Sequence, residues 1–184
     1  DRLLCQERQR VQQARMLLDL AGIKDLELLP FIQTVADAIN SSLGVDDTEL
    51  VLLDEQGKHV VCVGRPGRGG SDRICDERET SELLSSTWIQ EVLSTGQPLM
   101  CDDVSIDPRL SNDFKGSRTR SLLAVPIQVA GEKRGILRVA TEQTGSFGSE
   151  DLAFLSLIAA QVGLSVERSD LARRQLEISR QQAK

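Results

Sequence analysis

The chain has 184 residues, of which 40% are hydrophobic and 27% are charged, and its formal net charge is −6. These values are typical of a soluble globular chain with one domain of ~100–150 residues and additional helix. The acidic balance disfavours a broad nucleic-acid surface, and the 3% aromatic content disfavours stacking platforms for bases. No apolar run reaches the ~18–20 residues of a membrane span, and four cysteines without a C-x-x-C pair favour the reducing cytoplasm.

The first predicted element is an N-terminal helix over residues 1–24, which are rich in Gln and Arg. Its apolar residues recur at intervals of seven, at Leu4, Val11 and Leu18. Such a narrow stripe is typical of a helix that pairs with another helix. Residues 26–43 then show an apolar face with helical spacing that ends at Gly44, and residues 49–54 and 58–64 predict a β-hairpin.

The middle of the chain alternates polar loops with short regular elements. A charged, Gly-rich loop covers residues 64–80, and a helix is predicted from Ser81 to Gly96. A short strand follows at residues 97–101, and then an irregular polar stretch at residues 102–118. This stretch has more polar residues than a connector between strands requires, so we expect it to cover a ligand site.

A second hairpin, with long strands, is predicted at residues 121–130 and 134–142, and a final helix follows to the end of the chain. Ser149 is its expected N-cap, because acidic residues in the next turn favour the positive end of the helix dipole. Residues 167–184 are expected to form a coiled-coil-like linker helix. The final helix as a whole carries an apolar stripe of Leu157, Leu164, Leu171 and Ile178, spaced by seven residues. We expect a parallel homodimer whose interface is formed mainly by the two terminal helices.

This order of elements predicts an α+β fold with one domain at residues 25–166. Most strand pairs come from hairpins, so we expect a mainly antiparallel sheet with helices packed on one face. Long helices are expected at both ends of this domain, as a signalling or dimerisation helix on the N-terminal side and a linker helix on the C-terminal side.

Two segments resemble the GAF family of sensory domains. Residues 107–141 are similar to the family's polar loop, strand, turn and strand, with SLLAVPI followed by GIL. Residues 147–171 are similar to the family's closing helix signature, which begins here with FGSED. The resemblance covers residues 26–166 and implies a six-stranded antiparallel sheet with helices behind it and a ligand cavity on the other face. It also implies an output domain in the same full-length chain.

The resemblance implies that the polar stretch before the SLLAVPI strand roofs the ligand site. We expect the site to be lined or rimmed by Trp88, Cys101, Asp103, Asp107, Phe114, Arg118 and Arg120. The two arginines have two interpretations, namely solvated ion pairs with neighbouring carboxylates or a charged mouth for an anionic or zwitterionic ligand. The small ligand itself is unknown, but the motifs of cyclic-nucleotide-binding and bilin-binding members are missing, so both of these cofactors are disfavoured.

The cysteines give a second hypothesis, which is redox sensing. Free cysteines are usually small buried hydrophobes, but Cys75 lies in a charged loop, where an exposed thiol is a liability. Together, Cys62, Cys75 and Cys101 could hold an iron–sulfur cluster or form a reversible disulfide. A third hypothesis is a thiol-dependent enzyme similar to the free methionine sulfoxide reductases of the same family, with Cys101 in the reaction.

We therefore expect a non-enzymatic regulatory domain of a cytoplasmic signal-transduction protein, with a two-component sensor histidine kinase as the preferred host. A small ligand or a redox event would change the roof of the site, and the C-terminal helix would pass this change to the output domain. We expect no catalytic residues, and neither nucleic acid nor a membrane as a partner.

Overall fold

The structure is a computed structural model that describes residues 28–53, 60–64 and 77–183. The predicted helix at residues 1–24, with its stripe of Leu4, Val11 and Leu18, lies outside these ranges. In chain order the elements are α2 (Leu28–Leu43), β1 (Asp47–Leu53), β2 (Val60–Gly64), α3 (Glu77–Ser85), α4 (Thr87–Thr95), β3 (Leu99–Cys101), β4 (Ser121–Val129), β5 (Glu132–Thr141) and α5 (Ser149–Gln182).

The strands of the described ranges form one sheet of five strands in the order β2-β1-β5-β4-β3, and every neighbouring pair is antiparallel. The turn between β4 and β5 has positive φ angles at Ala130 (52°) and Gly131 (83°), as the tight turns of hairpins require. β5 also pairs with β1, with Leu50 opposite Leu137, and this pairing joins the two hairpins into one sheet. The antiparallel α+β fold is confirmed, but the sixth strand implied by the resemblance is not present in the described ranges.

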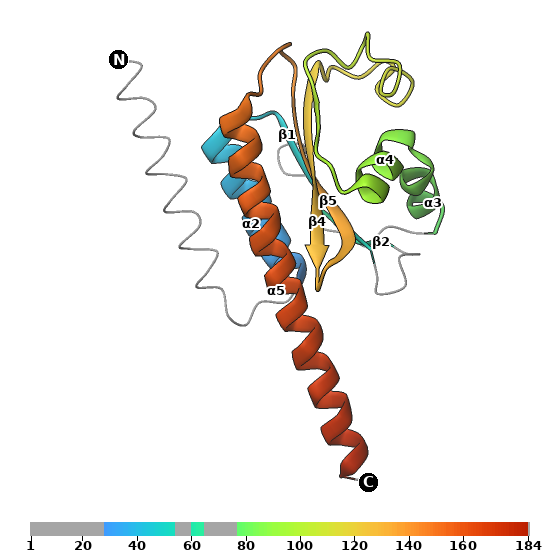
Figure 1. Cartoon of the computed structure of the whole chain (residues 1–184), viewed down its shortest axis with the longest axis vertical. Coiled ribbons are helices and arrows are strands. Elements are labelled where there is room, and N and C mark those ends of the chain that lie inside the picture. The colour runs from blue at the N-terminus through green and yellow to red at the C-terminus, as the bar shows by residue number, and fades with distance from the viewer. Residues whose placement is uncertain (1–27, 54–59, 65–76, 184) are drawn as a thin grey trace.

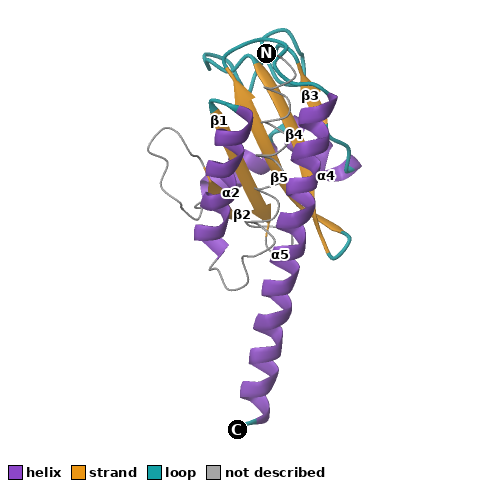
Figure 2. Cartoon of the chain, turned by 90° about the vertical axis from the view of Figure 1, so that its left-hand side faces the viewer, coloured by secondary structure: helices purple, strands orange, loops and turns teal. Residues whose placement is uncertain are grey.

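Helices cover both faces of the sheet, which corrects the prediction of helices on one face (Figure 1). α2 and α5 lie across one face (Figure 2), and α3, α4 and the loop at residues 102–118 cover the other. The physical reason lies in β4, where the consecutive side chains of Leu122, Leu123, Ala124 and Val125 are all buried. Because successive side chains of a strand point to opposite faces, both faces of this strand need a cover.

The predicted helix between Ser81 and Gly96 is two helices, because the chain is non-helical at Ser86. The backbone N–H of Ser86 donates to the carbonyl of Leu83, and the side chain of Gln90 donates to the carbonyl of Leu84. These bonds satisfy the last carbonyls of α3 while α4 turns its apolar side toward the sheet. Trp88, Ile89 and Val92 of α4 are therefore buried.

α5 begins one residue earlier than predicted, with Gly148 rather than Ser149 as its N-cap. The backbone N–H of Gly148 donates to the Asp151 carboxylate at 2.8 Å, which is the side chain-to-backbone half of a capping box. The helix then runs to Gln182 without interruption, and every side chain from residue 171 to residue 183 is exposed. The expected linker at residues 167–184 is thus the direct continuation of a helix that belongs to the core of the domain.

In the part of the chain that the structure describes, α5 is long and apolar enough to cross a membrane, judged by length and composition alone. Its apolar residues have a different role here, because Phe154, Leu155 and Ile158 are buried against the sheet. A core helix passes the same test, and packing on the sheet accounts for these buried apolar residues of α5.

Candidate ligand-binding face

The face of the sheet under α4 and the loop at residues 102–118 carries a compact apolar cluster. Its members come from α4, β3, β4, β5 and the loop, and they are Trp88, Ile89, Val92, Leu99, Cys101, Val104, Leu110, Leu122, Ala124 and Ile136, with Phe114 packed against them. The rings of Trp88 and Phe114 have their centroids 6.3 Å apart and are tilted by 39°. The structure thus brings together three of the predicted site residues, Trp88, Cys101 and Phe114.

Hydrogen bonds hold the loop over this face. At its base the N–H of Val104 donates to the carbonyl of Arg120 at 2.7 Å, which keeps the two ends of the loop together. Within the loop, the carbonyl of Asp107 accepts from Leu110, and that of Leu110 accepts from Phe114. These turns point Leu110 into the core, where it is fully buried, and place Phe114 half-buried above the sheet.

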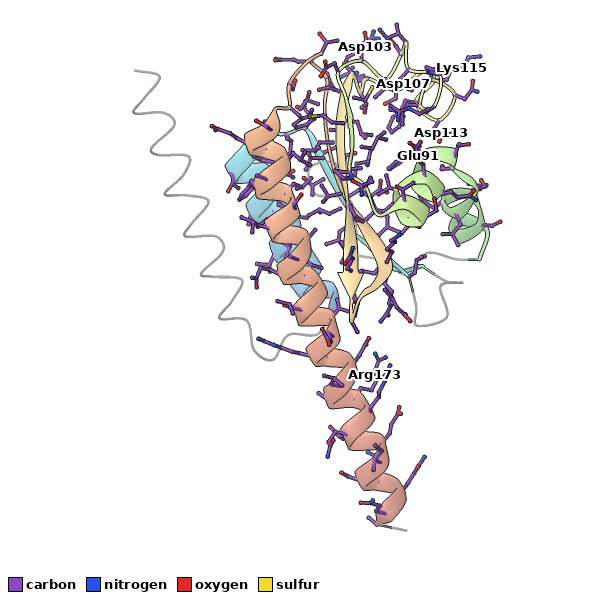
Figure 3. All side chains as sticks on the ribbon, in the orientation of Figure 1. Glu91, Asp103, Asp107, Asp113, Lys115 and Arg173 are labelled. Atoms are coloured by element: carbon purple, nitrogen blue, oxygen red, sulfur yellow. The ribbon has the colours of Figure 1, made fainter. Side chains whose placement is uncertain are left out.

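Asp107 forms the polar anchor of the loop. Its carboxylate accepts two hydrogen bonds from the Arg109 guanidinium, at 3.1 Å and 2.8 Å, and one from the Arg109 backbone at 2.9 Å. The Arg109 side chain lowers the pKa of Asp107 to about 2, and Asp107 in turn raises the pKa of Arg109. Arg109 also reaches Glu91 of α4 at 3.4 Å. Figure 3 labels Asp107 on the loop and Glu91 on α4. The contacts of Arg109 with Asp107 and Glu91 therefore tie the loop to α4.

The Cys101 thiol is buried, and burial raises its pKa. The thiol also forms a hydrogen bond with the Asp107 carboxylate. An ionised carboxylate can only accept hydrogen bonds, so the Cys101 thiol is the donor. A protonated and buried thiol is a poor nucleophile. The environment of Cys101 is therefore that of a structural cysteine.

The three predicted redox cysteines are not brought together. Cys62 lies on β2 and Cys101 on β3, at opposite edges of the sheet with three strands between them. At about 4.8 Å between neighbouring strands, their backbones are roughly 19 Å apart, whereas a disulfide needs Cα atoms within about 7 Å. Cys75 lies outside the described residues. Among the side chains that are described, no group of three or more His, Cys, Asp or Glu is placed to hold a metal ion.

A buried ionic cluster under Phe114 was missed by the sequence analysis. Arg138 of β5 is only 8% exposed, and its Nη2 atom lies 2.7 Å from Asp47 and 2.8 Å from Glu49, both on β1. Its guanidinium carbon lies 5.8 Å from the centroid of the Phe114 ring, a cation–π distance. Its Nε atom has no hydrogen-bond partner within the described part of the chain. The sequence signal that could have indicated this cluster is Arg138, the one charged residue in the largely apolar segment GILRVAT.

The other predicted site residues lie at the base and rim of the loop. Asp103 accepts hydrogen bonds from the side chain and backbone of Ser105, which lower its pKa, and the charge of Arg120 adds to this shift. Arg118 is 76% exposed and lies 3.8 Å from Glu142. Arg118 is therefore a solvated surface charge in this structure, and a role for the two arginines as a charged mouth stays a prediction.

The expected dimer residues of α5 are exposed. Leu157, Leu164, Leu171 and Ile178 keep between 47% and 56% of their surface in solvent. Since each residue turns a helix by about 100°, their stripe is centred opposite the buried side of α5 that packs on the sheet. A second surface of α5 is thus free of contacts with the described part of the domain.

The comparisons with known proteins agree with this geometry. The family model of the GAF domain matches residues 30–167. A free methionine-R-sulfoxide reductase from Neisseria meningitidis, solved with its substrate, is 19% identical with a TM-score of 0.68, and the match covers 89% of this chain and 91% of that one. No curated protein matches the chain.

Two structures that are not reductases have a similar fold. The GAF domain of a phosphoenolpyruvate-protein phosphotransferase from Coxiella burnetii is 15% identical with a TM-score of 0.69, over 90% of this chain and 96% of that one. Residues 122 to 287 of a methyl-accepting chemotaxis protein are 19% identical with a TM-score of 0.63, over 85% and 98% of the two chains. At these identities the likeness shows a shared fold.

Proposed function

The chain belongs to the GAF domain family, and from this premise we propose that it is the sensory domain of a signalling protein that works as a parallel dimer. α5 is the observation that carries the proposal. One side of this helix is part of the domain core, the opposite side carries an exposed apolar stripe, and the helix continues beyond the sheet. A helix with these three properties can transmit a change in the sheet to whatever follows it.

The stripe favours a second copy of the chain as its partner. Full burial of a leucine contributes about 1.5–3 kcal/mol, so a half-exposed one gains about 1 kcal/mol when it is covered. A parallel pair covers both copies of Leu157, Leu164, Leu171 and Ile178 at once, for about 8 kcal/mol in total. This gain is comparable with the lower part of the association cost of about 4–15 kcal/mol. The α5 pair would therefore dissociate on dilution unless other segments contribute.

The face under the loop is the proposed sensing site for a small ligand. Trp88 and Phe114 supply an apolar wall, and Arg138 lies directly under Phe114. A ligand that displaces the half-buried Phe114 ring would gain the aromatic contact with Trp88 and alter the environment of the buried guanidinium. The loop would move while Asp107 and Arg109 keep it tied to α4.

We place the domain in a cytoplasmic signal-transduction protein, with a sensor histidine kinase as the preferred host and an output domain after α5. The similar fold of a methyl-accepting chemotaxis protein supports a signalling role. The similar fold of the reductase supports an enzyme instead, but the buried Cys101 with its raised pKa does not favour thiolate chemistry. A regulatory rather than an enzymatic role is therefore the function that this site supports best.

The double variant Leu164→Glu with Leu171→Glu tests the proposal. The parent should sediment as a dimer at high concentration, and the variant should be a folded monomer with an unchanged circular dichroism spectrum. The matched control is Ala172→Glu with Ser179→Glu, which adds the same charge at exposed positions of α5 away from the stripe. The control should keep the dimer. A dimer that survives in the Leu164→Glu, Leu171→Glu chain would overturn the proposed interface.

A further inference from the structure

An ionic contact lies at the point where α5 leaves the sheet. Asp170 is the last buried residue of the helix, with 7% of the whole residue exposed, and residues 171–183 beyond it are exposed. Its carboxylate lies 2.7 Å from the guanidinium of Arg134, at the start of β5, and these two side chains are 10% and 12% exposed. Arg134 also donates to the carbonyl of Leu53, the last residue of β1, at 3.1 Å. One arginine therefore joins the ends of two strands to the exit of the helix.

Asp170 has a second partner on its own helix. Its other carboxylate oxygen accepts a hydrogen bond from the guanidinium of Arg173, three residues further on. The Arg173 side chain is 62% exposed, and the residue lies below the sheet in Figure 3. If Arg134 withdrew, Asp170 would keep the Arg173 cation, so its carboxylate would not become an uncompensated buried charge. Arg134 would keep its hydrogen bond to the neutral Leu53 carbonyl but would lose its counter-charge, which limits release to part of the population.

We infer that the Arg134–Asp170 pair is a releasable latch that fixes the projecting part of α5 to the sheet and connects it to the ligand-binding face. This inference rests on the proposed relay function. β5 carries Arg134 at the latch and Arg138 under Phe114, four residues apart, which is about 13 Å at 3.3 Å per residue. A shift of β5 that starts under Phe114 reaches Asp170 along a single strand.

Amide hydrogen exchange of the full 184-residue chain tests the latch. Arg134→Gln should accelerate exchange at residues 167–174 about tenfold, as expected for losing a hydrogen bond between charged groups, while residues 152–160 keep their protection. Arg173→Gln is the matched control, because it removes the exposed partner of Asp170 and leaves the Arg134 contact in place. It should change exchange at residues 167–174 by less than about twofold. Unchanged exchange in Arg134→Gln, or a uniform increase over the whole domain, would overturn the latch.

A second substitution separates a latch from a simple anchor. Phe114→Ala removes the ring above Arg138 and should change exchange at residues 167–174 in the parent chain, but not in the Arg134→Gln chain. An equal effect in both chains, or none in the parent, would refute the connection through β5. The exchange measurement requires neither a ligand nor a dimer. If the latch fails while the chain still dimerises through α5, the proposed function stands and the latch is overturned. If the chain is a monomer with an intact latch, the latch stands and the proposed dimeric function is overturned.

Discussion

Replacing Gly163 with alanine should destabilise the domain, although helix propensity alone predicts the opposite sign. In an open helix position, a change from glycine to alanine stabilises by about 1 kcal/mol. Gly163 lies where α5 crosses β4, and an added Cβ atom would lie 2.0 Å from the carbonyl oxygen of Gln128 and 3.1 Å from its carbonyl carbon. Both are backbone atoms, so no side-chain rotation can relieve the overlap.

The size of the effect follows from the movement that the substitution requires. The contact must open from 2.0 Å to the 3.4 Å at which ordinary van der Waals contact begins, and this moves α5 away from β4. Overpacking of this kind typically costs about 1–3 kcal/mol, and two backbones in contact place Gly163→Ala near the upper value. After subtracting the propensity gain of about 1 kcal/mol, we expect a net loss of about 2 kcal/mol.

Urea unfolding followed by circular dichroism measures this loss. Ala160→Gly is the reference, because Ala160 is exposed on the same helix and its substitution reports propensity alone, with an expected loss of about 1 kcal/mol. Gly163→Ala should lower the midpoint without changing the slope of the transition. If it raises stability by about 1 kcal/mol instead, the close approach of α5 to β4 is wrong.

Two further substitutions test the candidate site. Because the folded chain holds the pKa of Asp107 at about 2, below its ordinary value of 3.8, its pairing with Arg109 stabilises the fold above about pH 4 and is lost toward pH 2. Asp107→Asn should therefore be less stable than the parent at pH 7, by a difference that shrinks on acidification; a constant difference would contradict the ion pair. Arg138→Met should cost about 3–5 kcal/mol by removing the cation bonded to Asp47 and Glu49, with Arg138→Lys recovering part of it. Trp88 fluorescence during urea unfolding measures both, and an Arg138→Met chain as stable as the parent would refute the buried cluster.

The elements with strong local patterns were predictable from the sequence. The hairpin of β4 and β5 follows from two apolar runs around a Gly-containing turn, and α5 follows from its acidic first turn and helical spacing. The unbroken apolar run of β4 already indicated that both faces of the sheet are covered. The prediction of helices on one face did not take this run into account. Local burial patterns report how many faces are buried, and they leave open which elements cover them.

The candidate site was less predictable, because it depends on long-range pairing. Trp88, Cys101 and Phe114 were found from their place around one loop. The partners of Arg138 are on β1, with Asp47 91 residues earlier in the chain, and only the register of β1 against β5 brings them together. The separation of Cys62 from Cys101 likewise depends on strand order, which spacing along the sequence does not determine.

Parallel pairing of two copies through α5 is tested most directly by cross-linking at Ile178. In a parallel pair the two copies of an Ile178→Cys residue face each other across the stripe, where a disulfide needs Cβ atoms about 3.5–4.5 Å apart. Glu177→Cys is the matched control, because residue 177 is exposed about 100° away around the helix. Under mild oxidation we predict a covalent dimer for Ile178→Cys, while Glu177→Cys stays at the level of the unmodified chain with its four native cysteines. Equal cross-linking at both positions, or none at residue 178, would contradict the parallel pair.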